Sequence, residues 1–188
     1  FPIPRTEYRE LFFAKDEELR MQAPETETFV KYDSEIGEPI ERVRFRHTFE
    51  KKTRLMGLPK AVVYMSCDDL DDMIVYVLIR KLDRQGKELL NLNIPWKAAP
   101  YDKMDDIPVK ELSNLLLYFG PMGVLRASHR EVDPTRSIHP QYPFHTHSNV
   151  QKIPPGQVVK LEIGLWAMGI DFEEGESLSV QKSEQYPL

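Results

Sequence analysis

Hydrophobic and polar residues alternate along several short stretches of this chain. The clearest runs from Val158 to Trp166, and residues 42–49 repeat the pattern with arginines at the polar positions. A period of two sends successive side chains to opposite faces of a strand. Both stretches are therefore predicted to be half-buried strands. In the first, one face carries Val159, Leu161, Ile163 and Leu165.

Residues 61–67 and 73–79 are instead apolar at nearly every position. Such runs suit central strands that are covered on both faces. The acidic connection 68–72 between them is too short for a helical crossover, which favours an antiparallel arrangement. Further strands are expected over Val124–Arg130 and Ser177–Val180, with turn signals before residue 158 and at Glu174-Gly175-Glu176.

One segment departs from the strand pattern. Asp106 is placed to cap a short helix that has Pro108 in its first turn. Its apolar face would carry Val109, Leu112, Leu115 and Leu116. Fifteen prolines spread over the chain disfavour longer helices. The pattern thus predicts an all-β, antiparallel sandwich with a short helical insertion, formed as a single domain over residues 1–188.

Composition narrows the possible partners. The 188 residues are 41% hydrophobic and 10% aromatic, which is sufficient for a core. Mean hydropathy is −0.46, and no run approaches the roughly 18 apolar residues of a membrane helix, so no membrane partner is expected. The net charge of −5 argues against a nucleic-acid partner, which would require a basic face.

The single cysteine and the first residues give information on disulfide bonds and on the protein to which the chain belongs. Cys67 has no second cysteine with which to form an internal disulfide. The chain starts Phe1-Pro2-Ile3-Pro4, without an initiator methionine or a signal segment, and is therefore expected to be part of a longer protein. Localisation is a property of that longer protein; the lack of a disulfide pair and a signal segment favours the cytoplasm only slightly.

A search for hydrolytic residues assigns none. No Gly-x-Ser-x-Gly occurs, and the nearest Ser–His pair is Ser128-His129. Neighbours on a strand point to opposite faces, so these two side chains are not expected to act as nucleophile and base. Cys67 has no histidine beside it and is interpreted as a structural thiol.

Two stretches have the composition of metal sites. His145 and His147 lie two residues apart, with His139 shortly before them, but no Cys, Asp or Glu accompanies them in this proline-rich loop. The acidic turn 68–72 lacks the ligand order of a Ca²⁺ loop. The simpler interpretation is a solvated loop in both cases, and no metal or other cofactor is assigned.

A basic cluster surrounds the strand at residues 42–49. A solvated strand face is its commonest explanation, and docking to an acidic surface of another domain is an alternative. No set of stacking aromatic residues accompanies the cluster, which weakens a nucleic-acid interpretation. Its members are Arg42, Arg44, Arg46, Lys51, Lys52, Arg54 and Lys60.

Several motifs, taken in order, resemble one family. They include Asp71-Asp72 followed by an apolar strand, Arg126-Ala127-Ser128-His129-Arg130, Leu165-Trp166 and Gly175-Glu176. This order is similar to that of the C-terminal non-catalytic domain of the X-Pro dipeptidyl-peptidase and cocaine-esterase-like (CocE/NonD) serine hydrolases. The resemblance runs through most of the chain and is most specific in its second half.

The resemblance implies a jelly-roll sandwich of the galactose-binding-like type. It also implies a partner: an N-terminal α/β-hydrolase domain of the same parent chain, absent here, that carries a Ser-Asp-His triad and cleaves ester or amide bonds. No catalytic residue is carried over, because none of the triad motifs lies in this chain. In the family the sequence continues well past Gly175-Glu176, so a missing last strand would leave an open edge and favour homo-oligomers.

Two functions remain open at this level. An accessory domain would support the catalytic domain, help shape its cleft, and expose an apolar strip where that domain packs. A free-standing jelly-roll module would instead bind a carbohydrate or another ligand through exposed aromatic rings. The candidates for such rings are Tyr32, Trp96, Tyr142 and Phe144.

Overall fold

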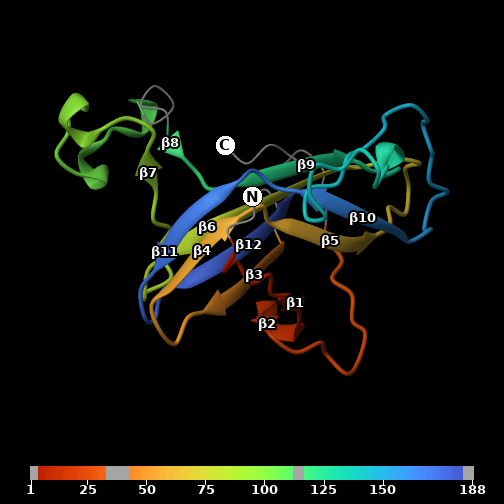
Figure 1. Ribbon diagram of the computed structural model, residues 1–188, viewed down its shortest axis with the longest axis horizontal. Coiled ribbons are helices and arrows are strands. Elements are labelled where there is room, and N and C mark those ends of the chain that lie inside the picture. Colours follow the sequence, from red (N-terminus) through yellow and green to blue (C-terminus); the bar gives the residue numbers. More distant parts are fainter. Residues whose placement is uncertain (1–3, 33–42, 112–116, 184–188) are drawn as a thin grey trace.

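The fold is a two-layer antiparallel β-structure, seen here in a computed structural model (Figure 1). The structure describes residues 4–32, 43–111 and 117–183. The helical elements among these residues are three-residue 3-10 turns. None of the described helices is long and apolar enough to cross a membrane.

The first layer is a four-stranded sheet in the order β3-β12-β6-β9, with every neighbouring pair antiparallel. On β6, Val75, Val77 and Ile79 point into the core. The residues between them form the outer face of the sheet, which faces away from the second layer. The strands are β3 (Val43–Thr48), β6 (Ile74–Leu82), β9 (Met122–Arg126) and β12 (Ser177–Ser183).

The second layer is a two-stranded ribbon in two parts. Strand β5 (Lys60–Met65) pairs with β10 (Val159–Gly164), and β4 (Thr53–Gly57) pairs with β11 (Met168–Phe172). Pro59 lies between the parts; it lacks an N–H for the ladder, although its carbonyl accepts from Leu165 N at 2.9 Å.

The core lies between the two layers. Leu161, Ile163, Leu165 and Phe172 of the ribbon side are at most 1% exposed. They belong to the same buried cluster as Val75, Val77 and Leu178 of the four-stranded sheet. Removing this apolar surface from water provides the main driving force for stacking the two layers.

Smaller elements attach to the sandwich at two places. A hairpin lies beside β3, and a lobe between β6 and β9 projects from the body at the upper left of Figure 1. The hairpin contains β1 (Phe12–Phe13), η1 (Lys15–Glu17) and β2 (Leu19–Arg20). The lobe contains β7 (Asn91–Leu92), η2 (Trp96–Ala98), η3 (Met104–Asp106), η4 (Val109–Glu111) and β8 (Leu117–Tyr118).

The lobe rejoins the sheet at Gly120. This residue has a φ of +107°, and a Cβ there would lie 1.9 Å from the carbonyl oxygen of Ile79. The next residue, Pro121, accepts a hydrogen bond from Ile79 N at 3.0 Å. Only glycine therefore allows the end of the lobe to lie this close to β6.

The antiparallel sandwich and most of the predicted strands are confirmed, with differences at particular strands. The expectation that residues 61–67 are covered on both faces is wrong, because Val62 is 36% and Tyr64 68% exposed. Strands β5 and β6 are also not neighbours, since they lie in different layers. The sequence analysis did not identify β4 and β11. The jelly-roll connectivity stays a prediction.

The helical insertion differs in detail from its prediction. Asp106 lies in the 3-10 turn η3 and does not cap a helix, and η4 extends only from Val109 to Glu111. Leu112, Leu115 and Leu116, which were expected to extend the apolar face, lie outside the described residues. The insertion is therefore built from short turns that accommodate its prolines.

Candidate functional site

The Asp72 carboxylate joins two of the motifs that carry the family resemblance. Its Oδ2 accepts hydrogen bonds from Ser128 Oγ at 2.7 Å and Arg126 Nε at 2.7 Å. Its Oδ1 accepts from the backbone N–H groups of Ser128 at 2.9 Å and Met73 at 3.0 Å. Residues 56 positions apart are thereby tied together where β6 begins and β9 ends. We call Asp72, Arg126 and Ser128 the Asp72 tie.

The environment keeps the Asp72 carboxyl ionised. Burial by itself would raise its pKa, since the side chain is only 12% exposed. Hydrogen bonds from the Ser128 hydroxyl, the Arg126 guanidinium and two backbone N–H groups outweigh burial and lower the pKa to about 2. A carboxylate held this way is well suited to a structural role, because it has no proton to donate at neutral pH.

The predicted strand over Val124–Arg130 ends early because Ser128 binds the Asp72 carboxylate. Strand β9 stops at Arg126, and Ala127–His129 forms the 3-10 turn η5. Two hydrogen bonds from Ser128 to Asp72 favour this turn over a continued strand. The strand alternation that was expected to separate Ser128 from His129 is therefore wrong. Ser128 is fully buried, and its hydroxyl donates to a carboxylate.

Two other aspartates of the 68–72 turn form ion pairs with lysines of other segments. Asp68 pairs with Lys31 at 2.6 Å, and Asp71 pairs with Lys152 at 2.8 Å. Within the described ranges, no three or more His, Cys, Asp or Glu side chains are grouped to hold a metal ion. The solvated-turn interpretation missed these cross-connections, which fasten the turn to neighbouring loops.

The histidines that lie together in the structure differ from the three that the sequence grouped. His139 packs against Tyr8, with ring centroids 5.3 Å apart. His145 and His147 have centroids 6.2 Å apart, and His129 joins them at 5.3 Å from His147. The Glu162 carbonyl accepts a hydrogen bond from His145 Nε2 at 2.9 Å. This contact anchors the loop that carries His145 to the backbone of β10.

Of the four candidate aromatic residues, Trp96 is the most open, at 43% exposed. Tyr142 is half-buried and lies over Gly164, where a Cβ would meet its ring at 3.1 Å. The Arg136 guanidinium covers the half-buried Phe144 ring at 4.0 Å from the centroid. Tyr32 is half-buried as well, and so is Cys67.

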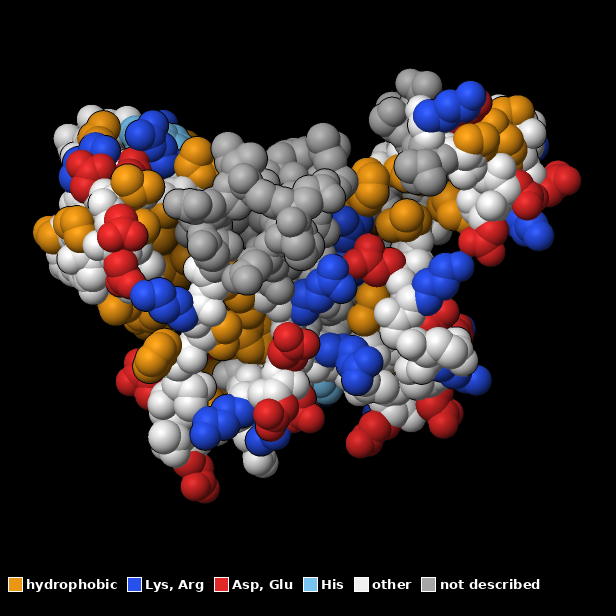
Figure 2. Space-filling view, turned by 180° about the vertical axis from the view of Figure 1, so that it is seen from behind, with side chains coloured by type: hydrophobic (Ala, Val, Ile, Leu, Met, Phe, Trp, Pro, Cys, Tyr) orange, Lys and Arg blue, Asp and Glu red, His pale blue; other side chains and the backbone are white. Residues whose placement is uncertain are grey.

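Acidic partners neutralise much of the basic cluster. Lys52 pairs with Glu173 at 2.6 Å, Arg54 binds Asp171 through two contacts of 2.6 and 2.7 Å, and Lys60 pairs with Glu162 at 3.0 Å. Arg42 lies outside the described residues. Figure 2 shows basic and acidic side chains interspersed over the visible face of the molecule.

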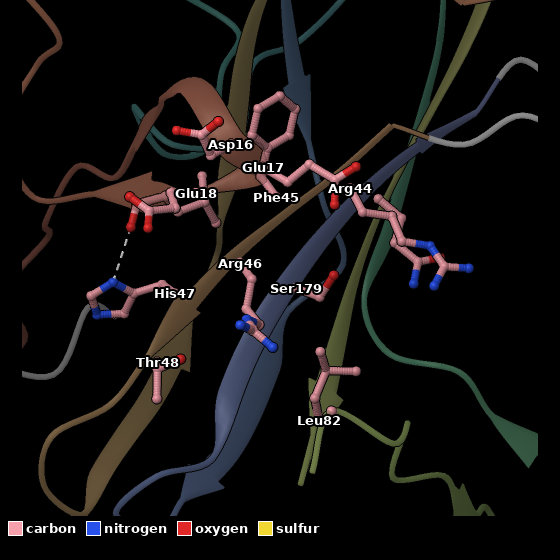
Figure 3. A pocket seen from close by; sticks show the side chains of 13 residues that line it. Asp16, Glu17, Glu18, Arg44, Phe45, Arg46, His47, Thr48, Leu82 and Ser179 are labelled. Atoms are coloured by element: carbon pink, nitrogen blue, oxygen red, sulfur yellow. Dashed lines mark hydrogen bonds between the residues drawn. The ribbon is translucent and has the colours of Figure 1, made fainter. Parts of the chain in front are cut away.

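Two arginines of that cluster lie together without a partner. Arg44 and Arg46 are exposed on the outer face of β3, and neither side chain has a hydrogen bond or ion pair in the part of the chain that the structure describes. They line a cavity of about 530 Å³, which we call the arginine cavity (Figure 3). Its wall also includes Asp16, Glu17, Ser179 and Gln181.

A second candidate surface lies on the same outer face of the sheet, at the edge formed by β6 and β9. Ile74 and Val124 are 43% and 53% exposed, and they are diagonal neighbours because Ile74 pairs with Arg126 and Val124 with Tyr76. Tyr76 and Met122 are half-buried on the same face. These four residues are called the outer strip. Nearby, Trp166 N donates to Met122 O at 3.1 Å, and Trp166 is 59% exposed.

Comparison with protein families decides where the chain belongs. The family model of the X-Pro dipeptidyl-peptidase C-terminal non-catalytic domain matches residues 1–183. This chain belongs to that family. The resemblance seen in the motifs is thereby confirmed, and those motifs include the Asp72 tie. A comparison with curated proteins finds no match.

Solved structures point to the same group of proteins. Two structures of a CocE/NonD family hydrolase from Staphylococcus aureus match at 29% and 30% identity, each with a TM-score of 0.80. They cover 100% of this chain, but the chain spans only 30% of theirs. An aminopeptidase from a Thaumarchaeota archaeon shares the fold at 13% identity, a TM-score of 0.58, and coverage of 96% of this chain and 29% of its own.

The sequence analysis missed both surfaces of the outer face. Ile74 and Val124 were placed within predicted strands, but their outward direction depends on which face the second layer covers. Gln181 lies beyond the predicted end of the last strand, which continues to Ser183. The alternating arginines at 44 and 46 were visible signals, although only the structure shows that acids neutralise Lys52 and Arg54 and leave these two arginines unpaired in its described part.

Proposed function

We propose that this chain is the C-terminal accessory domain of a serine hydrolase, which packs on an α/β-hydrolase catalytic domain and helps shape its cleft. In this proposal the parent protein cleaves ester or amide bonds, with acyl or dipeptidyl groups as substrates. The outer strip is the surface that meets the catalytic domain. The catalytic chemistry is carried out by residues outside this chain.

One observation carries the proposal. The chain matches a non-catalytic domain family over 183 residues, whereas the similar hydrolases are more than three times as long. This difference in length supports the proposal that the chain is one domain of a larger hydrolase. One structure with the same fold, at 12% identity and a TM-score of 0.57, is an α-amino acid ester hydrolase; 96% of this chain and 29% of that one are covered.

The outer strip supports the packing part of the proposal. Exposed apolar side chains that adjoin on one sheet face lose little by leaving water and gain by contact with another apolar surface. The outer strip consists of only four side chains, and Trp166 adjoins it through its backbone contact with Met122. This is the kind of apolar strip that the accessory-domain hypothesis predicts.

The binding-module alternative has weaker support. It requires aromatic rings that present a free face to a sugar, and two of its four candidates are covered by Gly164 or Arg136. Trp96 is the remaining open ring with a defined exposure, and it lies in the projecting lobe. No specific observation favours this alternative over the accessory domain.

The test is a charge placed in the outer strip of the complete protein that contains this chain. Val124→Glu should weaken hydrolysis of p-nitrophenyl acetate or of glycyl-prolyl p-nitroanilide, because docking would bury an unpaired carboxylate. The penalty amounts to several kcal/mol and hence to a loss of about tenfold or more in docked, active protein.

Val62→Glu provides the matched control. Val62 points outward on β5, in the other layer, and is 36% exposed. The proposal expects the control to keep nearly full activity. Equal activity of both variants and the natural protein would refute docking through the outer strip, and a complete protein without hydrolytic activity toward either ester or amide would refute the parent activity.

A further inference from the structure

The two arginine side chains of the arginine cavity have no hydrogen bond or ion pair among the described residues. Arg44 and Arg46 alternate on β3 and thus project from the same face, with guanidinium groups directed away from the strand (Figure 3). Lys52, Arg54 and Lys60, of the same basic cluster, each have an acidic partner within 3.0 Å. A guanidinium has five N–H donors in a planar fork that matches a carboxylate.

The floor of the arginine cavity is polar and buried. Ser179 and Gln181 lie opposite Arg46 and Arg44 on the adjacent strand β12, and each is 3% exposed. The Gln181 amide nitrogen donates to Glu88 Oε1 at 2.9 Å, which fixes the direction of the amide. Its Oε1 is buried and has no hydrogen-bond partner among the described residues. A buried acceptor without a partner is costly and calls for a donor.

The rim of the cavity carries the opposite charge. Asp16 and Glu17 have left-handed backbone conformations, with φ of 62° and 59°, and Figure 3 shows Glu17 extending across β3 toward Arg44. No ion pair between described residues closes this gap. Carboxylates at the rim repel a multiply charged anion such as phosphate more strongly than a monoanion.

We propose that the arginine cavity binds a small organic monocarboxylate that also carries an N–H or O–H donor. The carboxylate would lie between the Arg44 and Arg46 guanidinium groups, and the donor would reach Gln181 Oε1. A volume of about 530 Å³ is within the usual range for sites of small molecules. This proposal is independent of the catalytic domain and of the bonds that the parent cleaves.

The test uses the complete protein and isothermal titration calorimetry with three matched probes. N-acetylglycine has both the carboxylate and the donor, acetate lacks the donor, and N-acetylglycinamide lacks the charge. N-acetylglycine should bind, acetate should bind about tenfold more weakly for want of one hydrogen bond, and the uncharged amide should show no binding. Inorganic phosphate should bind more weakly than N-acetylglycine.

Variants link any binding to this cavity. Arg44→Ala combined with Arg46→Ala should abolish binding of N-acetylglycine, while replacement of both by lysine should leave a reduced affinity, because lysine keeps the charge and loses the fork. Lys51→Ala is the control: Lys51 is exposed just beyond β3 and outside the cavity wall. It should bind as the natural protein does.

Several results would overturn the proposal. N-acetylglycine that fails to bind the complete protein, or that binds the double alanine variant unchanged, would show that the arginines do not form a carboxylate site. Acetate that binds as well as N-acetylglycine would remove Gln181 from the site. Phosphate that binds more tightly would contradict the selection of a monoanion by the acidic rim.

Discussion

The Asp72 tie and the arginine cavity use the same kinds of side chain in opposite ways. In the tie, the buried Asp72 carboxylate is satisfied by four donors, including the guanidinium of Arg126. In the cavity, Arg44 and Arg46 have no partner among the described residues, and the buried Gln181 Oε1 is unsatisfied.

This contrast separates structural from binding roles. The tie contributes two of the motifs that carry the family resemblance. Its buried Asp72 carboxylate already accepts four hydrogen bonds and has no acceptor capacity left for a ligand. The cavity contributed no motif to that resemblance, but its donors and its acceptor are unused. In these two regions, a family motif supports the fold, whereas unused donors next to an unsatisfied buried acceptor mark the candidate site.

Removing the tie should have the largest effect. Asp72→Ala leaves the Ser128 hydroxyl and two N–H groups without an acceptor in a mostly buried place, so we expect a loss of about 3 kcal/mol in the free energy of unfolding. Urea denaturation of the chain measures it. Asp69→Ala, an exposed neighbour, should change stability by less than about 0.5 kcal/mol; similar losses in both variants would contradict a specific tie.

The low pKa of Asp72 predicts how stability depends on pH. The folded value of about 2 lies below the usual unfolded value of about 3.9, so the ionised group stabilises the fold fully above pH about 4. This contribution, roughly 2 to 3 kcal/mol, is lost as the pH falls through the folded pKa. Denaturation followed from about pH 5 to about pH 2 should show a shallower decline for Asp72→Asn than for the natural chain. Parallel declines would argue against the tie.

The close approach of the lobe to β6 predicts a smaller loss. Gly120→Ala places a Cβ against the Ile79 carbonyl and requires a backbone conformation that alanine avoids, so we expect a loss of about 2 kcal/mol. Thermal unfolding measures the change. Gly169→Ala is the control, because nothing lies within 4 Å of the added atom. A tolerated Gly120→Ala would mean that the lobe can move away from the sheet.

The outer strip should show the smallest effect on the chain by itself. Val124→Glu replaces a side chain that is already 53% exposed, so the free energy of unfolding should change by less than about 0.5 kcal/mol. Chemical denaturation checks it. A large loss would mean that Val124 supports the fold. The reduced activity expected of this variant in the complete protein would then result from unfolding of the domain and not from weaker docking.

Sequence periodicity predicted much of the sandwich because its strands bury alternate residues. The predicted strand from Val158 to Trp166 is observed as β10, Val159–Gly164, and the alternating arginines of β3 lie as expected. The prediction failed at β4 and β11, whose apolar positions are interrupted by Arg54 and Asp171, a pair that meets only across the ribbon. It failed again at Ser128, where a hydrogen-bonded carboxylate 56 residues away ends the strand.

The candidate surfaces were less predictable, for a different physical reason. The charges at Arg44 and Arg46 could be seen in the sequence, whereas the lack of partners depends on long-range contacts. Val62 and Val124 occupy similar apolar runs, and only the layering shows that both point outward. Gln181 matters because it is buried, and burial at that position follows from the segments that cover the outer face, such as the one that includes Glu88.

Amide hydrogen exchange on the complete protein and on this chain alone tests the central claim most directly, namely that this is an accessory domain that docks through the outer face near β9. The account predicts that the catalytic domain slows exchange around Val124 and Trp166 and leaves the outward face of β5, around Val62 and Tyr64, unchanged. Protection confined to β5 or identical exchange in both proteins would contradict it.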